Sequence, residues 1–160
     1  MREVKAVRRE YPESPIIGVG GIVLLDDRVL IAKRAREPGK GTWTLPGGMV
    51  ELGESLEEAL RREIMEELSL SIRIRGLVKL VDKIVRDKED RIRYHYVIAD
   101  YLVYPLSGKV QPGSDISDAK YVPLKDVHAM GLNPEVVETI LLADGMRRGE
   151  PGLRRNHVPA

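Results

Sequence analysis

Apolar runs rich in β-branched residues alternate along the chain with charged and glycine-rich segments, and they predict the strands of a sheet. Asp26-Asp27 separates the first two runs and favours a tight hairpin, and the turn at residues 88–90 separates two much longer runs. The predicted strands are residues 15–25, 28–35, 71–87, 91–105 and 119–124.

Two other segments repeat their apolar residues with a helical period. Ser55, with Glu58 three residues on, forms a capping box, and the residues that follow the helical spacing are Leu56, Leu60, Ile64 and Leu68. Residues 133–146 begin with Asn-Pro, which starts helices. The glycine- and proline-rich residues 36–43 predict a loop. Strands on both sides of a central helix predict an α/β domain.

The length of 160 residues suits one hydrophobic core. We expect a single domain over residues 1–146, in which the charged residues 1–14 form an edge strand or an arm. Residues 147–160 are polar and predict a loosely held C-terminal tail.

Composition excludes several classes of function. Apolar residues make up 42% and charged residues 32%, as in folded soluble proteins, and a net charge of +1 does not favour nucleic acid or membrane partners. The absence of cysteine excludes disulfides and thiolate metal sites. Because no apolar run approaches the roughly 20 residues of a membrane span and the N-terminus lacks a signal-peptide pattern, we expect a cytoplasmic protein.

The most unusual stretch places seven glutamates within residues 51–67, directly after Pro-Gly-Gly. On a helix that begins at Ser55, Glu63, Glu66 and Glu67 fall within an arc of roughly 100°, beside the apolar flank. Carboxylates near a core are unfavourable unless they are paired or bind metal. Oxygen ligands of this kind suit Mg²⁺ or Mn²⁺.

A simpler interpretation is an exposed acidic helix, supported by the i,i+4 pairs Glu57–Arg61 and Glu58–Arg62. The helix cap, the apolar flank and the preceding Leu45–Gly48 turn favour the metal site instead. Glycine permits close backbone approach there, so that a main-chain carbonyl can complete the shell of ligands.

Residues 48–70 resemble the signature of the Nudix hydrolase family: Gly, five residues, Glu, seven residues, Arg-Glu, an aliphatic, any residue, Glu-Glu, any residue, Gly, an aliphatic. Ser69 stands where the family usually has glycine. The matching residues are Gly48, Glu54, Arg62, Glu63, Ile64, Glu66, Glu67 and Leu70. The resemblance covers about residues 15–145 and implies an α/β/α sandwich with a mixed β-sheet.

It also implies metal-dependent hydrolysis of a nucleoside diphosphate linked to another moiety, with Mg²⁺ or Mn²⁺ as cofactor. The roles carried over by position are metal ligation by Glu66, Glu67 and the Gly47 carbonyl, ligation or base catalysis by Glu63, and an orienting role for Arg62. The base in this family often lies outside the signature. Asp115 is our first candidate and Asp118 our second, although both also fit turn positions.

Residues 32–48 and 93–103 are similar to compact prokaryotic ADP-ribose pyrophosphatases, so ADP-ribose or a related nucleotide sugar is the expected substrate. Arg34 and Arg36 are candidates for binding its phosphates, and Trp43 for stacking on its base; surface arginines and a core tryptophan are the alternatives. The resemblance also implies a homodimer.

Other functions stay open, because the ADP-ribose subgroup usually carries a proline shortly beyond the signature. Here none occurs between Pro46 and Pro105. The alternatives are a pyrophosphatase for (d)NTPs or dinucleoside polyphosphates, a non-catalytic module that senses nucleotides, and an RNA-end hydrolase. The last of these requires a basic channel that the net charge does not indicate.

Overall fold

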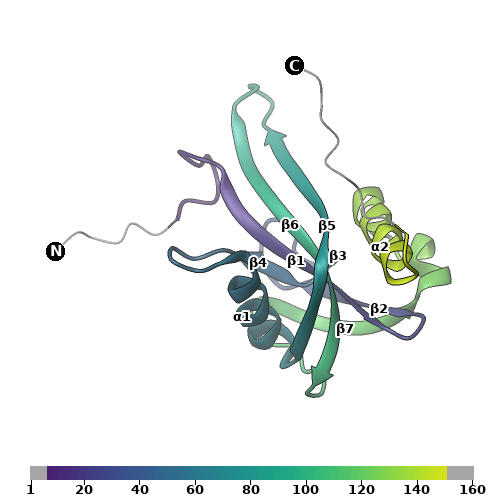
Figure 1. Ribbon diagram of the computed structural model, residues 1–160. Coiled ribbons are helices and arrows are strands. Elements are labelled where there is room, and N and C mark those ends of the chain that lie inside the picture. The colour runs from purple at the N-terminus through teal and green to yellow at the C-terminus, as the bar shows by residue number, and fades with distance from the viewer. Residues whose placement is uncertain (1–6, 151–160) are drawn as a thin grey trace.

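A twisted sheet lies between two helices in the computed structural model, which describes residues 7–150 (Figure 1). The strands are β1 (Ile16–Leu25), β2 (Arg28–Arg34), β3 (Trp43–Thr44), β4 (Gly47–Met49), β5 (Ser71–Arg86), β6 (Ile92–Ser107) and β7 (Ile116–Pro123). The helices are α1 (Leu56–Leu68), α2 (Pro134–Arg147) and the short 3-10 helix η1 (Leu124–Ala129).

The sheet is mixed, as predicted. Its strands follow the order β3-β2-β1-β6-β5, with β4 also paired to β1 and β7 to β2. Strands β1 and β6 run parallel, and the other pairs are antiparallel. The predicted α/β/α sandwich is therefore confirmed, with β1 at the centre of the sheet.

Alternation along β1 gives the sheet two apolar faces. Val19 and Val23 pack in the core beneath α1 with Leu60, Ile64 and Leu68, whereas Ile22 and Leu24 pack beneath α2 with Ile140. Because both faces of β1 are buried, the strand reads as a nearly continuous apolar run rather than an alternating one.

Helix α1 begins with the predicted capping box. The Ser55 hydroxyl accepts a hydrogen bond from the Glu58 N–H at 3.2 Å, and the Glu58 carboxylate accepts one from the Ser55 N–H at 2.7 Å. The helix ends at Ser69, which has a left-handed φ of 58° although it is not glycine. The loop between β6 and β7 supports this end, because Gln111 and Gly113 donate their N–H groups to the carbonyls of Leu68 and Glu67.

Three features differ from the sequence predictions. The predicted turn at Leu45–Gly48 is wrong at its glycines, which lie in β4 and pair with Val19 and Gly20 of β1. Strand β7 begins at Ile116, before the predicted residue 119, because it follows the whole length of β2. The segments β3 and η1 were not predicted; β3 contains only two residues, too few for a recognisable pattern.

The N-terminal segment contacts the sheet without forming a strand over residues 7–15. The Tyr11 N–H donates to the Arg93 carbonyl at 2.8 Å, and its hydroxyl donates to the Asp87 carboxylate at 2.9 Å. Residues 1–6 and 151–160 lie outside the described residues, and with them parts of the expected arm and tail. The domain boundaries therefore stay a prediction.

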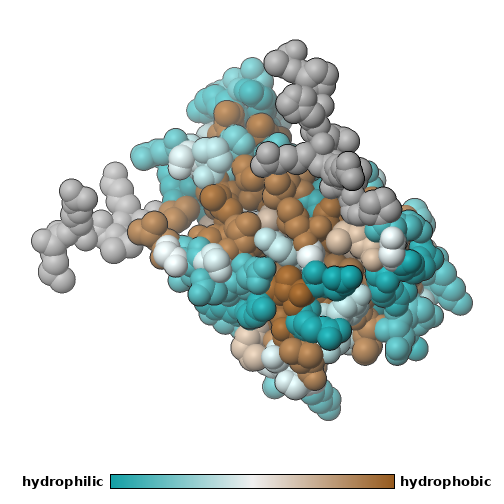
Figure 2. All heavy atoms as spheres, in the orientation of Figure 1, coloured by the Kyte–Doolittle hydropathy of each residue, from teal (hydrophilic) through white to brown (hydrophobic). Residues whose placement is uncertain are grey.

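The β5–β6 hairpin extends beyond both helices, and Figure 2 shows hydrophobic surface over this part of the molecule. Its exposed aliphatic residues include Leu77, Leu80, Ile84, Val85 and Ile92. This surface lies on the sheet rather than on the acidic helix. The expected homodimer stays a prediction. None of the helices within residues 7–150 is long and apolar enough to cross a membrane.

We expect Ser55→Ala to destabilise the fold by about 1 kcal/mol, because it removes the side-chain half of the capping box. Urea unfolding followed by circular dichroism measures the change. Ser14→Ala, a substitution at an exposed position in the N-terminal segment, is the control and should leave the unfolding midpoint unchanged. Equal midpoints for the two variants would show that the cap does not stabilise α1.

Candidate active site

Helix α1 presents two of its carboxylates directly to the backbone of β4. The Gly47 N–H donates to the Glu67 Oε2 at 2.9 Å. Gly48 lies against the Glu63 carboxyl group so closely that an added Cβ would collide with it. Gly48 therefore allows the helix and the strand to approach, and the Gly47 N–H places Glu67 beside Glu63 at β4.

Glu67 is buried, with 5% of its surface exposed. Burial raises the pKa of its carboxyl to about 8, and the charges of Glu63 and Asp115 add to the rise. The hydrogen bond from Gly47 and the charge of Arg34 lower this pKa. Burial likewise raises the pKa of Glu63, against the opposing effect of Arg62. The charge of Asp115 thus raises the pKa of both glutamates, and a bound cation would offset this repulsion.

Arg62 organises the outer side of this acidic group. Its Nε and Nη2 donate to the two oxygens of Glu54 at 2.6 and 2.9 Å, which holds the pKa of Glu54 at about 2. Its Nη1 donates to Glu63 at 2.8 Å and to Glu66 at 3.4 Å, and Nη2 also donates to the Met49 carbonyl. Arg62 therefore fixes the side chains next to Glu67 as well as the end of β4.

The exposed-helix alternative describes only the outer face of α1. Glu57 and Arg61 form the expected i,i+4 pair at 3.8 Å with both side chains half exposed. The expected pair Glu58–Arg62 is wrong, because Glu58 belongs to the capping box and Arg62 turns to Glu54. Sequence reasoning did not identify this Glu54–Arg62 contact, although both residues belong to the matched signature.

Asp115 reaches the acidic group from the loop before β7. Its carbonyl accepts the Ala35 N–H at 2.7 Å, and its carboxylate is paired with Arg36 at 3.0 Å. Its charge contributes to the raised pKa of Glu63 and Glu67. Asp118 is exposed on β7, where its Oδ1 accepts the Ala119 N–H at 2.8 Å. Of the two aspartates, it is Asp115 whose charge acts on the glutamates.

The predicted substrate-binding residues lie in two different settings. Arg34 ends β2, is partly buried, donates from Nε to the Pro38 carbonyl at 2.7 Å, and acts electrostatically on Glu67. Trp43 of β3 packs against the core beneath α2, and the ammonium groups of Lys33 and Lys120 lie 5.8 and 4.6 Å from its ring centroid. Trp43 thus has a packing role, and its stacking on a base stays a prediction.

The donor set fits a hard divalent cation in its chemistry. The available side-chain donors are carboxylate oxygens, and one of these carboxylates, that of Glu67, is buried against the backbone of β4. Within residues 7–150, however, no three acidic, histidine or cysteine side chains are already arranged to hold a metal ion. Glu63 and Glu66 are both paired with Arg62, at 2.8 and 3.4 Å.

Comparisons with known proteins show the family to which the chain is similar. The model of the NUDIX domain family matches residues 15–141. The ADP-ribose pyrophosphatase of Methanocaldococcus jannaschii is 32% identical over 123 residues, which cover 77% of this chain and 70% of that protein.

Solved structures show the same similarity. The MutT NUDIX hydrolase from Burkholderia pseudomallei superposes with a TM-score of 0.70 at 30% identity, over 81% of this chain and 98% of that one. The NUDIX domain of Shewanella oneidensis NrtR, solved with ADP ribose, gives a TM-score of 0.68 at 25% identity, over 84% and 90% of the two chains.

We expect Gly48→Ala to weaken Mn²⁺ binding by about tenfold, because the new methyl group displaces the Glu63 carboxyl group from β4. Electron paramagnetic resonance of free Mn²⁺ measures the affinity. Gly76→Ala is a matched control: the nearest side-chain atom lies 3.8 Å from its added Cβ. Unchanged Mn²⁺ affinity in Gly48→Ala would contradict metal binding by Glu63.

Proposed function

The chain belongs to the Nudix hydrolase family, and on that premise we propose a metal-dependent pyrophosphatase that acts on a nucleoside diphosphate linked to another moiety, with ADP-ribose the favoured substrate. One observation carries the proposal. Glu63 and Glu67 of α1 lie against the glycine backbone of β4, and the loop that carries Asp115 is bonded to the end of the same helix through the Gly113 N–H and the Glu67 carbonyl.

Glu63, Glu66, Glu67 and the Gly47 carbonyl are the residues that would hold the divalent cation that Nudix hydrolases generally use. Such a cation, Mg²⁺ or Mn²⁺, supplies charge neutralisation at the pyrophosphate and lowers the pKa of bound water. Arg62 keeps the carboxylates next to it in place through its bonds to Glu54 and Glu63.

Asp115 is the proposed general base, because it lies at the rim of the acidic group and is partly exposed to solvent. The oxygen of the attacking water forms the new bond to phosphorus, the bridging P–O bond breaks, and the proton of the water passes to the Asp115 carboxylate. Glu63 is the alternative base. Arg34 and Arg36 lie next to these carboxylates and are the proposed ligands of the substrate's phosphates.

ADP-ribose is favoured by the relatives. The Methanocaldococcus jannaschii protein carries the name of that activity, and the Shewanella oneidensis domain was solved with ADP ribose. The complete set of acidic residues favours catalysis over sensing alone.

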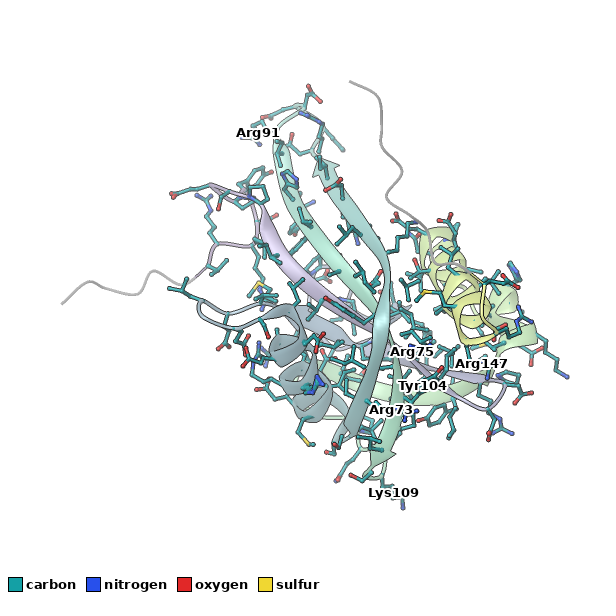
Figure 3. The ribbon with its side chains drawn as sticks, in the orientation of Figure 1. Arg73, Arg75, Arg91, Tyr104, Lys109 and Arg147 are labelled. Atoms are coloured by element: carbon teal, nitrogen blue, oxygen red, sulfur yellow. The ribbon has the colours of Figure 1, made fainter. Side chains whose placement is uncertain are left out.

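An RNA-end hydrolase is less well supported by the charges of the described residues. Figure 3 shows Arg73, Arg75 and Tyr104 along β5 and β6, with Arg91 at the tip of the hairpin. The Arg73 guanidinium lies over the Tyr104 ring, with its Cζ 5.5 Å from the ring centroid. Arg73, Arg75 and Arg91 are thus spread along the β5–β6 hairpin rather than gathered into one basic channel.

We expect Glu67→Gln to lower kcat at least about 100-fold while the fold stays intact, because the amide can still accept the Gly47 hydrogen bond but ligates metal poorly. Initial rates and thermal melts test this. Glu57→Gln, on the exposed face of the same helix, is the control and should retain its rate. Activity within threefold of wild type in Glu67→Gln would contradict the assignment of Glu67 as a metal ligand.

Removing divalent cations with EDTA should abolish hydrolysis, and Mg²⁺ or Mn²⁺ should restore it, because the donors are all oxygen atoms. The assay uses a panel of ADP-ribose, NADH, diadenosine polyphosphates and dNTPs, with the highest kcat/KM expected for ADP-ribose. Activity that persists after thorough chelation would contradict metal dependence, and a higher kcat/KM for a dNTP would contradict the substrate.

A further inference from the structure

The ion pair between Arg36 and Asp115 joins two residues that are held very differently. The Arg36 Nε lies 3.0 Å from the Asp115 Oδ1, and the exposed fractions of the two side chains are 72% and 35%. Asp115 is fixed by its backbone, since its carbonyl accepts the Ala35 N–H and the next residue, Ile116, is buried in the core beneath α1. Arg36 instead extends through solvent, so it is the partner that can turn away.

The pair also lies where an anionic substrate has to arrive. The loop that carries Asp115 is bonded to the end of α1, because the Gly113 N–H donates to the Glu67 carbonyl at 2.9 Å. The charge of Asp115 also raises the pKa of Glu63 and Glu67. Arg36 is thus a cation at the rim of a group of carboxylates that otherwise repels phosphate. In the free protein, however, its Nε is already engaged by Asp115.

Arg36 can leave Asp115 for a phosphate at little cost in free energy. An exposed ion pair contributes roughly 0–1 kcal/mol to stability, so little is lost when it opens. A guanidinium binds a phosphate through two parallel hydrogen bonds, an arrangement that is stronger and more directional than a single contact at Nε. A diphosphate that reaches the site is therefore a better partner for Arg36 than Asp115 is.

We propose that the Arg36–Asp115 pair is a substrate-displaced latch: the incoming diphosphate takes Arg36 from Asp115, and the released carboxylate becomes free to accept the proton of water. The inference rests on the proposed function and adds a form of regulation to it. Asp115 is masked in the free protein, and binding of the anionic substrate unmasks it.

A purely structural role for Arg36 predicts the opposite behaviour. If Arg36 only held Asp115 in position, the pair would persist in the complex, and loss of Arg36 would affect the chemical step rather than binding. If the two residues acted independently, Asp115→Asn would merely relieve repulsion of phosphate, and it would do so whether or not Arg36 were present.

Nuclear magnetic resonance suits this test, because the protein has a mass of 18.0 kDa and the Arg36 Nε–Hε signal reports the contact directly. Inorganic pyrophosphate is titrated in EDTA into wild type, Asp115→Asn, Arg36→Gln and the double variant. We expect pyrophosphate to shift the Arg36 signal of wild type toward its position in Asp115→Asn. We also expect Asp115→Asn to tighten pyrophosphate binding when Arg36 is present. The factor of tightening should be at least three times the factor that Asp115→Asn produces in the Arg36→Gln background.

Equal tightening in the two backgrounds, or an Arg36 signal that does not respond to millimolar pyrophosphate, would overturn the latch. The probe contains no nucleoside and is not turned over. Coupling between the residues in a protein that fails to hydrolyse ADP-ribose would therefore support the latch while refuting the proposed substrate.

Steady-state kinetics with ADP-ribose and Mg²⁺ provides a second measurement. We expect Arg36→Gln to raise KM about tenfold with kcat within threefold of wild type, and Arg36→Lys to restore part of the KM, because the lost contact is one of binding. Arg28→Gln, at the exposed start of β2, is the matched control. A fall in kcat at constant KM, with no rescue by lysine, would assign Arg36 a structural role and overturn the latch.

Discussion

Burial of the Glu67 carboxyl group is the constraint on which the arrangement of this protein depends. A carboxylate that is 5% exposed needs partners, and here the Gly47 N–H donates the hydrogen bond that holds it. That contact requires α1 to lie directly on the backbone of β4. Gly47 has a φ of 151°, and a Cβ at this position would collide with the Val19 carbonyl. The glycine is therefore required by the close pairing of β4 with β1, the strand next to it in the sheet.

The close approach of α1 to the sheet also requires a glycine in β1. Gly21 faces α1, and an added Cβ would press on the side chains of Ile64 and Leu60. These two side chains, both at 0% exposure, hold the helix on the sheet about one and two turns before Glu67. Apolar packing thus supplies the stabilisation that offsets burial of a carboxyl, and the packed helix positions the acidic residues on its neighbouring face.

The sequence predicted α1 well, because its cap, its apolar spacing and its acidic face all depend on residues close together in the chain. It predicted the long strands for the same reason. Its errors concern contacts between distant segments. Pro46 and the two following glycines look like a turn locally, yet Gly47 and Gly48 become a strand because β1 is available to pair with them. Arg62 has a well-spaced partner in Glu58, but the bend before α1 brings Glu54 closer.

The loop between β6 and β7 shows how stability and the proposed chemistry depend on the same contacts. Ser69 ends α1 in a left-handed conformation that costs a residue other than glycine roughly 1–2 kcal/mol. The N–H groups of Gln111 and Gly113 satisfy the last carbonyls of the helix and so help to offset that cost. The same loop continues directly to Asp115. The contacts that end the helix therefore also fix the distance of this aspartate from Glu67, so the loop cannot change its course without disturbing both.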